Sequence, residues 1–485
     1  MNYPAKTIDD AYNACDPVQK LTANDPRYVD FAEARGSDGA AASTCHKRIL
    51  RSRRTLVQLL AGHRGCGKST ELSQLKNALE KDGFTVVWID AEVDLDLEDT
   101  EPTDILLALI RGLETELRKQ EMLLPQNELD EFLNWFSEVV VEENVRSERE
   151  ATAKTELKGG FPAIVSSFAN LMFNVTGMIK TGTDSKKTIR HKLEPKLSQL
   201  LDRGQLLFQK GRALAIKKGN RDLVLIVDGL DRIALKTKSD GRNSHEILFI
   251  DRGDLLKGFD CHTILTVPIS LMFSSRAANL VAVFPDRCVL PMVKIADRNR
   301  EPDLAGCRLM RQVLEKRLDV NALTESGTVE RLIELSGGDP RQLMNLIRSA
   351  MDMIDEAPIT LGAVEKAFHR IQNDYGRSIP NDHWSLLAEV DQSHTVKNDA
   401  AHQSMLYNLS VLEYQNGDRW CAINPAVREL PQFLDAVKAL RANSPGASPP
   451  VKKKAAPKKT SAKKASQKKV TSKKEPKSKM GPKSL

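Results

Sequence analysis

A glycine-rich segment near the start of the chain limits its fold more than any other feature. Residues 62–70 read GHRGCGKST and match the spacing G-x-x-x-x-G-K-[ST] of a phosphate-binding loop. The preceding residues 55–60, TLVQLL, are apolar and partly β-branched, which predicts a buried strand. The following residues 71–79 carry leucines at helical spacing. A strand, a glycine loop and a helix in this order are the context in which the motif binds a nucleotide.

The residue types of the loop suit a phosphate chain. Its glycines let the backbone bend so that successive N–H groups point at one anion, and a helix that begins near Lys68 adds the positive end of its dipole. Lys68 would reach the β- and γ-phosphates, and the Ser69 hydroxyl would bind magnesium. A chance glycine turn before a helix is the alternative, which both flanks disfavour. The predicted nucleotide-binding residues are Gly62, Gly65, Cys66, Gly67, Lys68, Ser69 and Thr70.

A second motif supplies the acid that such a site needs. Residues 223–231 read LVLIVDGLD, and the apolar run predicts a strand buried on both faces, as in a parallel sheet. Asp228 would lie at the carboxyl end of that strand, where ligands of open α/β sheets bind. We predict that Asp228 holds magnesium through water, rather than only closing a turn. Asp231 either orients or deprotonates an attacking water, or caps a helix that starts at Arg232, and the sequence leaves both alternatives open.

Together the two motifs resemble the additional-strand P-loop ATPases, which include AAA+ proteins of the origin-recognition type and the signalling ATPases called STAND. The resemblance extends over residues 25–370 and implies ATP and Mg²⁺ as ligands. It implies a sensor strand between the loop strand and the Asp strand, for which 262–268 fits with Thr266 at the sensor-1 position, and a further strand at 288–294. Residues 335–343, LSGGDPRQL, resemble both the start of a sensor-2 lid helix, which implies that Arg341 contacts the γ-phosphate, and the Gly-x-Pro lid motif of STAND proteins.

Two departures limit what this resemblance implies. Most AAA+ enzymes carry Glu directly after the metal-holding Asp, where this chain has Gly229. The Asp-x-x-Asp form is more similar to slow switch ATPases, so we expect ATP binding with slow hydrolysis, coupled to a partner or to nucleic acid. The alternatives are a non-hydrolysing nucleotide-gated scaffold and a DNA-binding loader of the origin type. No arginine finger is assigned, because solvated surface charge is the favoured interpretation of Arg276 and of Arg287, which lie in the expected region.

The expected fold class is α/β: a parallel P-loop NTPase sheet with a helical lid, a helical insertion, a winged-helix-like module and a disordered tail. The predicted boundaries are 1–50 for a lead-in, 51–300 for the core, 301–375 for the lid, 376–440 for the module and 441–485 for the tail. Residues 120–220 would form the insertion, with helical spacing over 189–207. An insertion of this length suggests an oligomer contact, a sensor surface or packing alone.

The winged-helix-like module is expected to contain a hairpin closed by Asn416-Gly417, a strong turn signal. Tyr28, in the lead-in, would either stack on adenine or pack in the ordinary way. The second helix expected in the module, around 398–405, has no Lys or Arg to meet phosphate or guanine. Contact with a protein or support of the lid is therefore favoured over the reading of DNA.

The charge of the chain is concentrated in its tail. Residues 451–485 hold fourteen Lys and one Glu, so they carry +13, and residues 1–450 carry −6 within a total of +7. Without an aromatic residue the tail is expected to be disordered, and it is similar to the tails of linker histones. Dispersed lysine binds phosphate without reading sequence. We predict nucleic acid as a partner through 451–485, ahead of a solubility role or an anionic membrane contact; a protein partner and a nucleotide-dependent homo-oligomer are further candidates.

Cysteines and apolar runs indicate the compartment. The seven cysteines include no C-x-x-C pair, which predicts reduced thiols rather than a zinc ribbon or disulfides. Cys66 is either a passive loop residue or an unusually acidic thiol. No signal peptide is recognisable at the N-terminus, and the uncharged run 161–179 contains too many polar residues to favour a membrane span. A cytoplasmic protein is expected, with nucleoid association through the tail as an option.

Overall fold

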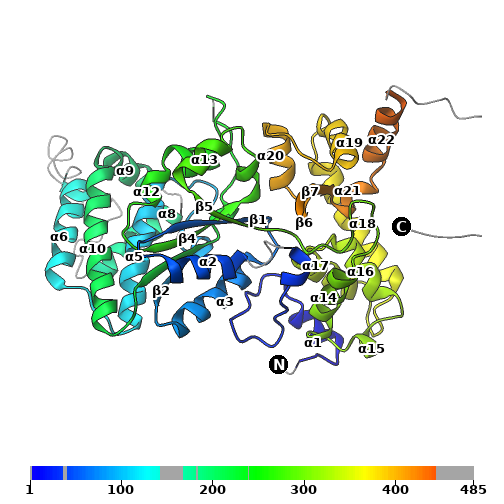
Figure 1. Ribbon diagram of the computed structural model, residues 1–485, viewed down its shortest axis with the longest axis horizontal. Helices are drawn as coiled ribbons and strands as arrows, with labels where there is room; N and C mark the ends of the chain where they lie inside the picture. Colours follow the sequence, from blue (N-terminus) through cyan, green and yellow to red (C-terminus); the bar gives the residue numbers. More distant parts are fainter. Residues whose placement is uncertain (1–2, 37–40, 143–167, 182–183, 239, 444–485) are drawn as a thin grey trace, which may run out of the picture. The chain divides into compact units, whose positions relative to one another are not determined.

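The chain folds around a parallel sheet. Its strand order brings the carboxyl ends of the strands before the glycine loop, before Asp228 and at 262–268 to one edge. The computed structural model describes residues 3–36, 41–142, 168–181, 184–238 and 240–443. The five-stranded sheet has the order β2-β3-β4-β1-β5 (Figure 1). This confirms the predicted α/β class, and β4 lies between β1 and β3 as expected for an additional strand. The strands are β1 Val57–Gly62, β2 Thr85–Asp90, β3 Leu223–Asp228, β4 His262–Pro268 and β5 Asp286–Leu290.

Alternation along the strands divides the core into two layers. Odd-numbered strand residues such as Leu59, Leu225 and Leu265 belong to one hydrophobic cluster, and even-numbered neighbours such as Leu60 and Val224 belong to another. Successive side chains of a strand point to opposite faces, so both faces of this sheet are buried. This double burial is the reason that the strands read as continuous apolar runs in the sequence.

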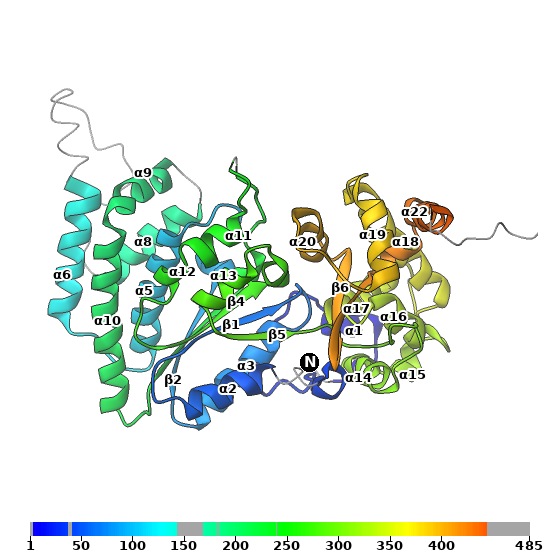
Figure 2. The ribbon, with the colours of Figure 1, turned by 45° about the horizontal axis from the view of Figure 1, so that its top comes forward.

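Helices cover each face of the sheet. The even-numbered side chains pack with helices α2 Ala41–Arg51 and α3 Lys68–Lys81, and the odd-numbered ones pack with α5 Pro102–Lys119 and α10 Leu197–Lys217 (Figures 1 and 2). Buried residues of α6 Gln126–Ser137, α8 Phe168–Lys180 and α9 Asp184–Leu193 belong to the same cluster as α5 and α10. The segment predicted as an insertion thus packs on one face of the sheet.

Prolines interrupt two predicted segments. The helical spacing predicted over 189–207 is confirmed, but the segment is divided into α9, which ends at Leu193, and α10, with the 3₁₀ turn Glu194–Lys196 and its Pro195 between them. The strand expected at 288–294 ends at Leu290. In both places a proline follows within two residues of the end, and its missing N–H and fixed φ interrupt a regular backbone.

Helices of the lid form a separate hydrophobic cluster, which includes the N-terminal segment. Ala11 and Phe31 are buried with Leu314, Leu343 and their neighbours. Residues predicted as a lead-in therefore contribute to the core of the lid. The elements concerned are α1 Ile8–Ala14, η1 Ala32–Arg35, α14 Leu304–Glu315, α15 Val320–Leu323, α16 Thr328–Ser336, α17 Pro340–Met351 and α18 Leu361–Ser378.

The C-terminal region contains the predicted hairpin. Strands β6 Val411–Asn416 and β7 Asp418–Ile423 pair antiparallel, with Gly417 at the turn. Helices α19 His383–Ser393, α20 Ala400–Tyr407, α21 Pro425–Arg428 and α22 Pro431–Asn443 complete it (Figure 1). The winged-helix assignment and the domain boundaries stay predictions, and the predicted tail lies outside the described residues from 444 onward.

Short elements connect these parts. Within the described ranges, no helix is both long and apolar enough to cross a membrane; residues 161–167 of the uncharged run lie outside those ranges. The connecting elements are α4 Ala91–Asp94, η2 Glu138–Glu142, η4 Leu230–Arg232, α11 Ser244–Glu246, η5 Ile247–Asp251, α12 Gly253–Leu256, η6 Ile269–Phe273 and α13 Ala277–Val283.

Two glycines with the same φ angle allow the packing of the lid against the rest of the chain to be tested. Gly338, just before α17, and Gly417 both have φ of 75°. A Cβ on Gly338 would lie 1.8 Å from the Val293 carbonyl oxygen, whereas one on Gly417 would meet nothing within 4 Å. Gly417→Ala should cost about 1 kcal/mol for its positive φ, and Gly338→Ala about 2 kcal/mol more because of the clash. Urea unfolding measures both, and equal losses would contradict the described approach of the lid to Val293.

Candidate functional site

The glycine loop has the geometry that the motif predicts. β1 ends at Gly62 and α3 begins at Lys68. Gly65 and Gly67 have φ of 94° and 99°, values that other residues rarely adopt. Gly67 is the N-cap of α3 and offers no side chain to the first-turn N–H groups. These donors therefore stay directed at the space in front of the helix, where an anion is favoured.

Lys68 lies at the centre of the loop in a buried ion pair. Its side-chain Nζ donates hydrogen bonds to the carbonyls of Gly62 at 2.8 Å and His63 at 2.7 Å, and lies 2.9 Å from Asp231 Oδ2. Lys68 and Asp231 are only 5% and 4% exposed. Asp231 is inside the 3₁₀ turn η4, whose N-cap is Gly229, so the alternative that Asp231 caps a helix is wrong.

Asp228 ends β3 and is the buried acid beside the loop. Its carboxylate is 1% exposed, and Oδ2 makes no hydrogen bond in the described structure. Burial raises the pKa of Asp228, while a hydrogen bond from the Ser69 hydroxyl acts in the opposite direction. An unsatisfied buried carboxylate oxygen beside a hydroxyl suits a hard cation such as Mg²⁺. Within the described residues, this site included, no group of three or more His, Cys, Asp or Glu is arranged to hold a metal ion.

A lysine that the sequence analysis missed lies at the same edge of the sheet. Register places Asp90, at the end of β2, beside Asp228 at the end of β3. Lys20 Nζ forms an ion pair with Asp90 and lies 3.4 Å from Glu92 Oε2 and 3.7 Å from Asp228 Oδ2. A protein cation therefore occupies the acidic end of the two strands. No local pattern marks Lys20, because it lies in an irregular segment more than sixty residues before Glu92.

The lid meets the loop at the start of α17. Asp339 caps this helix by accepting hydrogen bonds from the backbone N–H groups of Arg341 at 2.8 Å and Gln342 at 3.2 Å. A Cβ on Gly65 would lie 2.7 Å from Asp339 Oδ1 and 3.1 Å from Arg341 Cβ. Burial raises the pKa of Asp339 to about 6. The predicted γ-phosphate contact, Arg341, is thus held against the loop by a close contact that only glycine at 65 permits.

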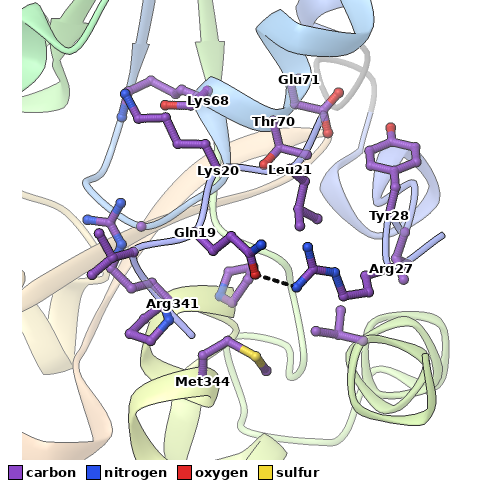
Figure 3. A pocket seen from close by; sticks show the side chains of 18 of the residues that line it. Gln19, Lys20, Leu21, Arg27, Tyr28, Lys68, Thr70, Glu71, Arg341 and Met344 are labelled. Carbon is purple, nitrogen blue, oxygen red and sulfur yellow. Dashed lines mark hydrogen bonds between the residues drawn. The ribbon is translucent and has the colours of Figure 1, made fainter. Parts of the chain in front are cut away.

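A pocket joins the loop, the lid and the N-terminal segment. Figure 3 shows Lys68, Thr70 and Glu71 on one side, Arg341 and Met344 below, and Tyr28 at the far end. Gln19 Oε1 accepts a hydrogen bond of 2.6 Å from Arg27 across it. Only three acidic residues line the pocket, Asp16, Glu71 and Asp231, against eight basic ones: Lys20, Arg27, Arg35, Arg64, Lys68, Arg232, Arg317 and Arg341. The excess of positive charge suits a polyanionic ligand.

Not every predicted residue faces this pocket. Thr266 in β4 is fully buried; its Oγ1 accepts a hydrogen bond from Leu230 N at 3.0 Å and donates one to Val227 O at 3.3 Å. Its contacts are thus with the backbone on both sides of Asp228. Cys66 is also buried, and burial raises the pKa of its thiol, so the alternative of an unusually acidic thiol is wrong.

The loop also contacts the C-terminal region. His63 Nε2 accepts a hydrogen bond of 2.8 Å from the Glu413 backbone N–H in β6. Burial lowers the pKa of His63 to about 3, so its imidazole is neutral and able to accept. Arg64 donates a hydrogen bond of 2.9 Å to the Tyr407 carbonyl. Its guanidinium carbon also lies over the Tyr407 ring, 4.3 Å from the ring centroid. Both loop residues occupy positions that the phosphate-loop motif leaves unspecified, so the motif gives no signal for these contacts.

Comparisons with known proteins give only a remote likeness. Neither the protein-family scan nor the search of curated proteins found a match. Among solved structures, Cdc6p from Pyrobaculum aerophilum is similar with a TM-score of 0.38 and 13% identity, covering 90% of this chain and 100% of its own. The Orc1 protein of Aeropyrum pernix in complex with DNA has a TM-score of 0.38, 11% identity and coverage of 88% and 96%. A Walker-type ATPase of Pyrococcus abyssi has a TM-score of 0.33, 11% identity and coverage of 88% and 99%.

The Lys20 contact predicts a change in magnesium dependence. Lys20→Met removes a positive charge from beside Asp228, so a divalent cation should bind there with less competition. With a fixed concentration of ATP analogue, the Mg²⁺ concentration at half-saturation should fall several-fold, in line with ~1 kcal/mol for one partly exposed ion pair. Titration followed by calorimetry measures this. Lys76→Met, which removes an ion pair with Glu80 elsewhere on α3, is the control, and a rise in the Mg²⁺ requirement of Lys20→Met would contradict the assignment.

Proposed function

We propose that the protein is a nucleotide-dependent switch that binds ATP with Mg²⁺ and hydrolyses it slowly. One observation carries this proposal: the Lys68 ammonium is buried 2.9 Å from Asp231, at the mouth of a cationic pocket with walls from both sheet and lid. A buried lysine needs an anion. A triphosphate is a ligand that would replace Asp231 as its partner.

Each residue of the site has a separate task in this proposal. The loop N–H groups and Lys68 bind phosphate, and Arg341 binds the terminal phosphate from the lid. Mg²⁺, when bound by Ser69 and Asp228, supplies neutralisation of phosphate charge. Asp231, once released from Lys68, orients the attacking water or accepts its proton. Position 229 supplies no carboxylate, which is why slow hydrolysis is proposed.

The same contacts support a conformational output. Arg341 and Asp339 link the loop to the lid, while His63 and Arg64 link it to α20 and β6. A ligand that changes the loop would therefore shift both regions toward the state that it binds better. The partner that reads this shift is a protein or a nucleic acid.

Substitution of the loop lysine tests the proposed function. Lys68→Ala should weaken binding of Mg²⁺–AMP-PNP roughly 10- to 100-fold, the loss expected for charge-assisted hydrogen bonds. Calorimetry measures binding, and phosphate release measures turnover. Because Lys68→Ala leaves Asp231 buried without its partner, the double variant Lys68→Ala/Asp231→Asn separates lost binding from lost folding.

Lys76→Ala, on the outer side of α3, is the matched control. Binding by the wild type without turnover above that of Lys68→Ala would favour the non-hydrolysing scaffold. Absence of AMP-PNP binding by the folded wild type would remove the proposal altogether.

Nucleic acid is the proposed partner of the lysine-rich residues 451–485. The charge of +13 in this segment supports contact with phosphate that falls steeply with salt and does not depend on sequence. Such contact would keep a cytoplasmic protein near the nucleoid.

Deletion of residues 451–485 should abolish binding to a random 30-base-pair duplex at low salt and leave AMP-PNP binding unchanged. Fluorescence anisotropy at several salt concentrations measures the first effect. DNA binding that survives the deletion and prefers one sequence would favour an origin-type loader, with the folded region as the reader.

A further inference from the structure

One arginine of the pocket has no assigned role. Arg232 follows Asp231 in η4 and lines the same pocket as Lys68 and Arg341. Its side chain is 24% exposed and forms an ion pair with Glu92, which lies just beyond the end of β2. Arg232 thus approaches the phosphate end of the pocket from the sheet, whereas Arg341 approaches from the lid.

Arg232 is partly buried near other arginines. Burial and the nearby charge of Arg341 lower the pKa of Arg232 to about 10, Asp90 acts in the opposite direction, and Arg64 acts in the same direction as Arg341. Its partner Glu92 is shared with Lys20, whose Nζ lies 3.4 Å from Glu92 Oε2. Glu92 is therefore divided between Arg232 and Lys20, while Lys20 also pairs with Asp90. Arg232 has Glu92 as its ion-pair partner, and an anion in the pocket would compete for the same guanidinium.

Gly229 lies beside Glu92. The glycine has φ of 89°, and a Cβ built on it would lie 3.6 Å from Glu92 Cγ and 3.4 Å from Ala91 Cβ, which are ordinary contact distances. The positive φ, rather than a lack of space, favours glycine at this position.

The other arginines considered for this role lie elsewhere. Arg276 forms an ion pair with Asp251, and Arg287 donates to the Phe284 carbonyl at 2.9 Å. Neither lines the pocket. Among the arginines that line the pocket, Arg64 donates to the Tyr407 carbonyl, whereas Arg232 directly follows Asp231 and Arg341 lies in the first turn of α17.

We propose that Arg232 binds the terminal phosphate of a nucleoside triphosphate from within the same chain, and that Glu92 holds it while that phosphate is absent. This inference rests on the proposed function and deepens it. The guanidinium exchanges one carboxylate for phosphate oxygens, which accept two parallel N–H bonds from an arginine. Arg232 and Arg341 then close on the phosphate from sheet and lid, and a second copy of the chain is not needed to supply an arginine.

The test compares a triphosphate with a diphosphate. Arg232→Ala should weaken binding of Mg²⁺–AMP-PNP roughly 10- to 100-fold, as expected for lost charge-assisted hydrogen bonds, and weaken ADP binding less than about threefold. Arg232→Lys keeps the charge without the planar fork, so its AMP-PNP affinity should lie between those of the wild type and Arg232→Ala. This variant also controls for a folding defect. Arg276→Ala, which breaks an ion pair outside the pocket, should change neither affinity.

Glu92→Gln supplies an independent readout. Freed from its carboxylate, Arg232 should bind AMP-PNP more tightly, and this gain should vanish when Arg232→Ala is also present, which separates it from any effect of freeing Lys20. Because no arginine from a second copy of the chain is required, turnover per chain should also not depend on protein concentration.

Equal losses for AMP-PNP and ADP in Arg232→Ala would overturn the inference, because Arg232 would then act through general charge. Unchanged AMP-PNP affinity in that variant would overturn it as well. In either case the wild type still binds nucleotide, whereas failure of the proposed function appears as no binding by the wild type.

Discussion

The buried ion pair between Lys68 and Asp231 is the interaction on which the rest of the site depends. An ammonium that is 5% exposed must be neutralised, because desolvation of an isolated charge costs several kcal/mol. Asp231 provides the neutralising negative charge at 2.9 Å. It can reach Lys68 because a single strand, β4, separates β3 from β1 in the sheet. The strand order thus brings two motifs that lie far apart in the sequence to one buried contact.

Much of the fold and part of the site follow from short-range patterns. The glycine loop, β3 with Asp228 at its end and the turn at Gly417 were predictable, because each depends on neighbouring residues: left-handed φ angles at glycine, apolar runs on a doubly buried strand, and a glycine between two strands. The position of β4 followed from a family resemblance rather than from its composition. The leucine spacing over 189–207 predicts helix but not where one helix ends and the next begins, which Pro195 determines.

The remaining site residues are set by long-range contacts that leave no local pattern. Lys20 reaches Asp228 from an irregular N-terminal segment, and Arg64 reaches Tyr407 across more than three hundred residues. Thr266 was expected beside the nucleotide, yet it bonds the backbone on both sides of Asp228. Such residues are identified only when the approach of loops to the sheet edge is known, since the same side chains elsewhere on a surface would be ordinary solvated groups.

The contacts of the loop also determine which regions would move when a ligand changes the conformation of the loop. His63 and Arg64 occupy positions that a phosphate-binding loop leaves free, and here they bind β6 and α20. His63 can accept a hydrogen bond only while neutral, and its burial lowers its pKa to about 3, which keeps this contact intact across physiological pH. The lid contact at Gly65 has no room for a side chain. A loop held on two sides by packed neighbours cannot rearrange alone, so any ligand that moves it has to shift the lid, the C-terminal region or both.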